Sequence, residues 1–155
     1  GWMTLSPRWR GLWGVSPWGT VTPPGLPLDY PGQRGFMQKV IVMMTDGDNN
    51  WHDYARPPAF DYTAYGRLTE GRLGTTSGST ATSRINDRML VLCDRIKAQG
   101  IKIYTITLGT SGGTRSLYQA CASSPAHYFH APTAGDLRGA FRAIGTQLSN
   151  LRLER

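Results

Sequence analysis

The chain has 155 residues, of which 39% are apolar, enough for one domain with a single hydrophobic core. Seventeen basic residues oppose ten acidic ones and give a net charge of +7. The arginines are scattered from Arg8 to Arg155, and no zinc-finger, basic-zipper or RNA-binding signature is present, so we expect no nucleic-acid partner. No apolar run approaches the roughly 18 residues of a membrane-spanning helix, so we expect no membrane contact by this segment.

Two regions differ in composition. Residues 1–37 are rich in Gly, Pro and Trp without apolar periodicity, which predicts irregular structure after the tail of a truncated helix. Because Gly1 is preceded by no initiator Met or leader, we interpret the chain as a piece of a longer protein. Residues 38–155 are predicted to form the folded domain. They include a polar and aromatic stretch, 48–83, that we expect to be a long loop.

The folded region begins with a strand. Val40–Met44 is a continuous apolar run, as expected for a strand covered on both faces of a parallel sheet. After the long loop, apolar residues at spacings of three and four predict a helix with Ser83 as its N-cap and Gly100 as its end. The β-branched segment 101–108 then predicts a second strand.

The remaining elements continue this alternation. A second helix is predicted over 114–122, a short strand over 127–131, and a last helix that opens on a capping-box-like Thr133-Ala-Gly-Asp136. Three strands that alternate with three helices predict an α/β fold with a doubly wound, Rossmann-like, mainly parallel sheet.

In such sheets the loops at the carboxyl ends of the strands build the ligand site, here 45–49 and 109–114. Asp46 ends the first strand with its carboxylate directed into the crevice, and Gly47 permits a sharp turn. The alternative is an ordinary Asp-Gly turn. The candidate binding residues at this edge are Thr45, Asp46, Gly47, Asp48 and Asn49.

A calcium loop is excluded by two positions. Asp46, Asp48 and Asn50 occupy positions one, three and five of an EF-hand loop. The sixth position, however, is Trp51 instead of Gly, and the twelfth is Pro57 instead of Glu.

Enzymatic signatures are weak. The loop 109–114 follows a strand and opens a helix, a context that can bind phosphate, but it lacks the P-loop and dinucleotide patterns and can be a simple turn. His127 and His130, three apart on a predicted strand, point to opposite faces, and no nucleophile elbow is present. We expect no enzyme; the alternative is a phosphate- or nucleotide-binding enzyme on the same sheet.

The loop 48–83 carries several aromatic residues. They form either an adhesive surface or a cover over the end of the sheet. They are Trp51, Tyr54, Phe60, Tyr62 and Tyr65.

The string Val40-Ile-Val-Met-Met-Thr-Asp-Gly-Asp-Asn49 resembles the strand and Thr-Asp-Gly loop of the metal-ion-dependent adhesion site in von Willebrand factor A-type domains. Further matching stretches are Lys97-Ala-Gln-Gly100, 101–106, Cys121-Ala-Ser-Ser-Pro125, Tyr128-Phe129 and Leu151-Arg-Leu153. Together with Trp2–Trp13 they make the chain similar to the periplasmic part of TadG-like proteins of the bacterial tight-adherence (Tad/Flp) pilus system. The resemblance covers nearly the whole chain and implies the C-terminal part of an A-type domain.

The resemblance implies a non-enzymatic cell-envelope module for adhesion or for assembly of the pilus. It implies a protein partner, a place on the periplasmic or cell-surface side of the bacterial inner membrane, and an upstream transmembrane helix that anchors the parent protein. It makes Asp46 a contributor to a Mg²⁺ site. That site is incomplete here, because the Asp-x-Ser-x-Ser loop and a second-loop Thr are expected upstream. The alternative is a structural envelope domain that does not bind metal.

The two cysteines, Cys93 and Cys121, lie on consecutive predicted helices that can share one face of the sheet. Resemblance to a periplasmic family favours a disulfide between them. Two buried thiols are the alternative.

Overall fold

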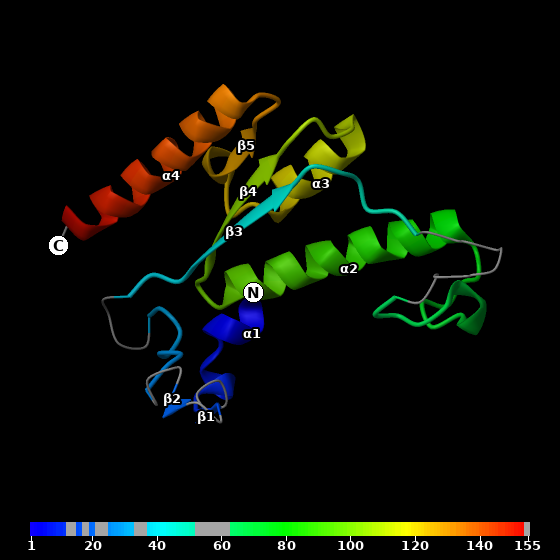
Figure 1. Cartoon of the computed structure of the whole chain (residues 1–155), viewed down its shortest axis with the longest axis horizontal. Helices are drawn as coiled ribbons and strands as arrows, with labels where there is room; N and C mark the ends of the chain where they lie inside the picture. Colours follow the sequence, from blue (N-terminus) through cyan, green and yellow to red (C-terminus); the bar gives the residue numbers. More distant parts are fainter. Residues whose placement is uncertain (12–14, 17–18, 21–24, 33–36, 52–62, 154–155) are drawn as a thin grey trace.

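The computed structural model describes residues 1–11, 15–16, 19–20, 25–32, 37–51 and 63–153. A three-stranded, all-parallel sheet with the order β3-β4-β5 lies at its centre. The strands are β3 (Val40–Thr45), β4 (Lys102–Thr107) and β5 (Tyr128–His130), and they alternate with the helices α2 (Gly78–Ala98), α3 (Gly112–Cys121) and α4 (Ala134–Leu153). The predicted α/β class, with a parallel sheet that alternates with helices, is confirmed (Figure 1).

The central strand β4 divides the core into two layers. Ile103 is fully buried on the face covered by α2 and α3, where it packs with Cys93, Ile96, Ile101 and Cys121. Tyr104 and Ile106 point to the opposite face, which is covered by α4 through Ala140 and Ile144. The helices therefore cover both faces of β4, and Figure 1 shows α4 on one side of the sheet and α2 on the other.

Strand β3 forms one edge of this sheet. Its residues pair in parallel register with β4, from Val40 beside Lys102 to Thr45 beside Thr107. The expectation that β3 is covered on both faces is wrong for the part of the chain that the structure describes, since Val42 and Met44 are 43% and 53% exposed. The reason is that α4 packs over β4 and leaves the edge strand open on that face.

Helix α2 begins earlier than predicted. Its N-cap is Ser77 and not Ser83, so the last part of the expected loop 48–83 is helical. The polar residues of this first turn gave no apolar signal. The cause is tertiary: Ala81 is fully buried against Leu68 and Leu73, two residues in and beside the short 3₁₀ helix η2 (Leu68–Glu70).

The ends of the other elements follow local chemistry. Helix α2 ends before Gly100, whose φ of +72° lies in the left-handed region, as predicted. At the start of α4, Asp136 accepts hydrogen bonds from the backbone N–H and the hydroxyl of Thr133, so the predicted capping box is confirmed. Strand β5 is shorter than expected, because His127 belongs to the 3₁₀ helix η3 (Pro125–His127).

The N-terminal region contains several short elements. The helix α1 (Trp2–Leu5) lies where the tail of a helix was expected. The composition did not predict the 3₁₀ helix η1 (Pro7–Trp9) or the antiparallel pair of β1 (Val15–Ser16) and β2 (Gly19–Thr20). Lys39 fastens this region to the sheet, because its buried ammonium donates hydrogen bonds to the carbonyls of Leu5 and Leu28. Burial is the main cause that lowers the pKa of Lys39. No helix among the described residues is long and apolar enough to cross a membrane.

Candidate functional site

The candidate site lies where the parallel strands end. Thr45, the last residue of β3, is beside Thr107 of β4, which is beside His130 of β5. The Thr45 hydroxyl donates to the carbonyl of Gly47 at 2.9 Å and accepts from the Gly47 N–H at 3.3 Å. Its own carbonyl accepts from the N–H of Leu108 at 2.9 Å. The first turn of the loop is therefore held to the sheet at its base.

Asp48 joins the two loops that the sequence places at this edge. Its carboxylate accepts hydrogen bonds from the hydroxyls of Thr114 and Ser111, the latter at 3.0 Å. Ser111 is also the N-cap of α3, because its hydroxyl accepts from the N–H of Thr114 at 3.3 Å. The hydrogen bond from Thr114, and then that from Ser111, lower the pKa of the Asp48 carboxyl. Asp48 is therefore ionised at neutral pH and holds the two loops together.

The residues after Asp48 extend the loop toward α2. The side-chain amide of Asn49 donates to Asn86 of α2 at 2.8 Å, and the N–H of Trp51 donates to the Thr82 hydroxyl at 3.0 Å. Asn49 thus has a structural partner. It fastens the loop to α2, as Asp48 fastens it to α3.

Two members of the aromatic stretch fold back. The side chains of Trp51 and Tyr65 are half-buried against the cluster formed by Leu68, Leu73 and Ala81. They cover the first turns of α2 and form no exposed adhesive surface. The other three aromatic residues of the stretch, Tyr54, Phe60 and Tyr62, lie outside the described residues.

Asp46 differs from Asp48 in its partners. Both residues are exposed, but within the described part of the chain the Asp46 carboxylate has no hydrogen-bond or ion-pair partner. The turn of Thr45 and Gly47 on one side and Asp48 on the other hold the backbone on which it stands. It is thus a carboxylate on a fixed loop, available to a ligand.

The described residues do not by themselves fit a magnesium ion. Mg²⁺ requires about six oxygen ligands in an octahedron. Among the described residues, no group of three or more His, Cys, Asp or Glu side chains could hold a metal ion. Asp48 is engaged by Ser111 and Thr114, which leaves Asp46 as the one unengaged carboxylate of the 45–49 loop. A metal would need further ligands.

The position of Asp48 also opposes phosphate binding by the 109–114 loop. A phosphate at this loop would take the hydroxyl of Ser111 and the N-terminal end of α3. The Asp48 carboxylate already accepts from Ser111 and Thr114, and its negative charge repels an anion.

Cys93 and Cys121 form a disulfide with a Cα–Cα distance of 5.3 Å. It joins α2 to the last turn of α3, on the face of the sheet that these helices cover. Both residues are buried. The disulfide fixes the C-terminal end of α3, and Asp48 holds the N-terminal end of the same helix.

The role of Asp48 was missed from the sequence. Asp48 is separated from its partners by 63 and 66 residues, so no local pattern relates them. The one available signal was Ser111 followed three residues later by Thr114 at the start of a helix, which predicts a capped end with hydroxyls that can donate.

We expect Asp48→Ala to loosen the 109–114 loop, because the substitution removes the acceptor of two hydroxyl hydrogen bonds. Amide hydrogen exchange should become faster in 109–116 and stay unchanged in β4. Asp46→Ala is the matched control, an exposed carboxylate in the same loop, and it should leave this exchange unchanged. In the wild-type protein the hydrogen bonds from Ser111 and Thr114 to the Asp48 carboxylate should weaken in acid, because protonation neutralises the acceptor. Their contribution to stability is lost as pH falls below the ordinary aspartate pKa of about 3.9 and through the lower pKa that Asp48 has in the folded state. Unchanged exchange in Asp48→Ala would show that the contact does not hold the loop.

Comparison of the chain with family models, with curated proteins and with solved structures finds no match.

Proposed function

We propose that the chain is a non-enzymatic recognition module that binds a protein partner at the carboxyl-end edge of its sheet, through Asp46. The observation that carries this proposal is the different use of two acidic residues in one loop. Both carboxylates are exposed, but Asp48 accepts hydrogen bonds from Ser111 and Thr114. Asp46 has no partner among the described residues and stands on a loop fastened to β4, α2 and α3. A fixed, exposed carboxylate can bind without the entropic penalty of ordering the loop.

The proposal also includes the protein family to which the chain belongs. The resemblance of the 40–49 string to A-type domains supports assignment of the chain to the C-terminal part of a doubly wound, Rossmann-like A-type domain, similar to TadG-like proteins. The function would then be adhesion or assembly in biogenesis of the Tad pilus. The disulfide is in keeping with an oxidising compartment such as the periplasm. An upstream transmembrane helix would anchor the parent protein to the inner membrane.

Two forms of recognition by Asp46 are distinguishable. In one, Asp46 pairs directly with a basic residue of the partner. In the other, Mg²⁺ lies between Asp46 and the partner, with its remaining ligands from outside the described residues. The A-type resemblance favours the second form, and removal of divalent cations separates the two.

The test is site-specific photo-crosslinking in intact cell envelopes. The photoreactive residue replaces Asn50, in the numbering of this chain, within the full-length parent protein. Asn50 is exposed and lies four residues after Asp46, so a photoreactive residue there reports on this edge. We expect a discrete adduct that disappears with Asp46→Ala and, in the metal-bridged form, with excess chelator that Mg²⁺ reverses. A photoreactive residue at Arg142, exposed on α4, is the control and should give no such adduct.

Two further results would contradict the proposal, and one would choose between its two forms. An adduct that persists in Asp46→Ala would show that Asp46 is not the contact. An adduct lost in Asp46→Ala but stable to chelator would favour direct pairing and exclude the metal bridge. No adduct at position 50 under any condition would favour a structural domain without binding at this edge.

A further inference from the structure

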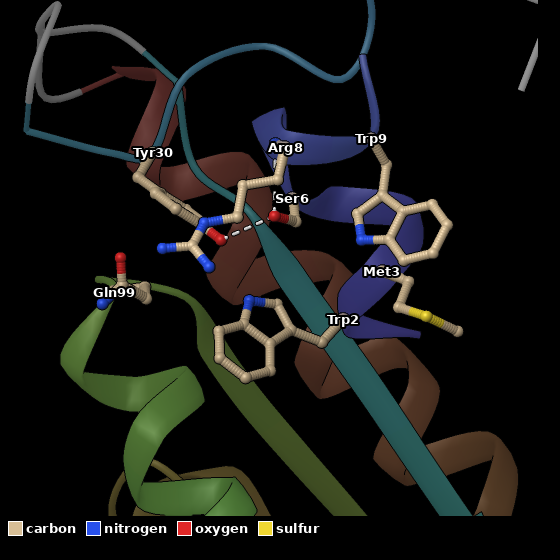
Figure 2. Close-up of a pocket in the computed structure, with 7 residues that line it drawn as sticks. All are labelled: Trp2, Met3, Ser6, Arg8, Trp9, Tyr30 and Gln99. Carbon is tan, nitrogen blue, oxygen red and sulfur yellow. Dashed lines mark hydrogen bonds between the residues drawn. The ribbon is translucent and has the colours of Figure 1, made fainter. Parts of the chain in front are cut away.

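A second candidate site lies at the opposite end of the sheet from Asp46. A cavity of about 320 Å³ is formed by α1, η1, Tyr30 and Gln99, the C-cap residue of α2. Its walls and the amino end of β3 are shown in Figure 2. It is independent of the proposed Asp46 site, because no residue of the 45–49 or 109–114 loops lines it.

Aromatic rings form much of its wall. Trp2 and Trp9 come from consecutive turns of the chain, and Tyr30 comes from a segment about 20 residues further on (Figure 2). The Tyr30 hydroxyl donates to the Ser6 hydroxyl at 2.9 Å, which fixes the direction of the ring. Trp2 and Tyr30 also pack against the core cluster of Ile101 and Ile103, so these two rings stand on a rigid base.

The polar groups of the cavity are mostly donors. The indole Nε1 of Trp2 is buried and has no hydrogen-bond partner within the described part of the chain. The guanidinium of Arg8 lies on the side toward which this nitrogen points (Figure 2). No Asp or Glu is among the described lining residues, and Asp29, which precedes Tyr30, is paired with Arg10 at 2.7 Å. The buried N–H can be satisfied by an acceptor of a ligand or by ordered water, and the Arg8 guanidinium beside it is exposed.

We infer that this cavity binds an acidic saccharide, a sugar ring that carries a carboxylate. The planar guanidinium of Arg8 matches a carboxylate with two parallel hydrogen bonds. The indole N–H of Trp2 and the side-chain amide of Gln99 can bind ring hydroxyls or the second side of the carboxylate. The faces of Trp2, Trp9 and Tyr30 can stack on the apolar C–H face of the ring.

The size of the cavity limits the ligand. Small-ligand sites have volumes of about 300–1,000 Å³, and this cavity lies at the lower end of that range. It therefore accepts a single sugar residue, either free or at the end of a chain. An inorganic anion would leave the aromatic walls without contact, and a neutral sugar would leave the exposed guanidinium of Arg8 bound to water alone.

Saturation-transfer difference NMR on the full 155-residue chain, with sodium glucuronate as the probe, tests the proposal. We expect transfer to the sugar C–H protons and a saturable titration. Arg8→Met should weaken binding by at least about tenfold, the effect of a lost hydrogen-bonded charge. Trp2→Phe keeps an aromatic ring but removes the N–H, and should weaken it about three- to tenfold. Arg115→Met, which removes an exposed arginine of α3 outside this cavity, should leave binding unchanged.

Competition identifies the chemical class. Glucose should compete at least about tenfold more weakly than glucuronate, because it lacks the carboxylate. Inorganic phosphate and benzoate should compete weakly, because one lacks the apolar face and the other the hydroxyls. Three results would overturn the proposal: no saturable transfer from glucuronate, glucuronate binding unchanged in Arg8→Met, or equal competition by glucose, phosphate or benzoate. The Asp46 site is unaffected by any of them, because its test uses position 50.

Discussion

Reduction of the Cys93–Cys121 disulfide is expected to lower the free energy of unfolding by about 3.5 kcal/mol, the chain-entropy value for a closed loop with the observed separation of 28 residues. The loss should be large in effect because domains of this size are stable by only about 5–15 kcal/mol. Urea unfolding of the oxidised and reduced chain, followed by circular dichroism, measures it directly.

A double variant supplies the control for this experiment. Cys93→Ala with Cys121→Ala should unfold like the reduced wild-type chain, apart from the small volume lost at two buried positions, and should not respond to reductant. A difference below about 1 kcal/mol between oxidised and reduced wild-type chain would contradict the prediction. Labelling of the unfolded, non-reduced chain should find no reactive thiol.

The isolated chain is expected to associate through β3. The outer edge of this strand pairs with no strand among the described residues, and Val42 and Met44 are exposed beside it. An unpaired strand edge with exposed apolar side chains favours pairing between chains. Sedimentation velocity over a range of concentrations should therefore show oligomers that increase with concentration.

Charged substitutions distinguish association through the β3 edge from association through apolar side chains exposed elsewhere. Met44→Lys should shift the chain toward monomer while it changes the free energy of unfolding by no more than about 0.5 kcal/mol, since the side chain is exposed. Val91→Lys is the matched control, because Val91 is 51% exposed on α2 and should have little influence on association. A wild-type chain that stays monomeric at all concentrations would contradict the prediction.

The parts of the fold that the sequence predicted are those with strong local signals. The apolar run of β3, the β-branched run of β4 and the capping box at Thr133 and Asp136 each specify an element within a few residues of itself. The start of α2 was not predictable in this way. Ser, Thr and Gly give no helical period, and the burial of Ala81 against Leu68 and Leu73 decides the conformation.

The candidate site was predictable only in its location. The alternation of strands and helices placed 45–49 beside 109–114, and the structure brings these loops together through Asp48. The sequence could not indicate which acidic residue is engaged within the molecule, because that depends on hydroxyls more than 60 residues away. The aromatic cavity was missed for the same reason, since Trp2, Tyr30 and Gln99 are brought together only by folding.

The most direct test of the proposed function is the yield of the position-50 cross-link in the parent protein with Asp46→Ala, measured together with amide exchange of 109–116. We predict that the cross-link is lost while exchange stays at the wild-type level, because Asp46 contacts the partner and Asp48 holds the loops. A cross-link that is retained, or one that is lost only together with faster exchange, would contradict the assignment of Asp46 as the recognition residue.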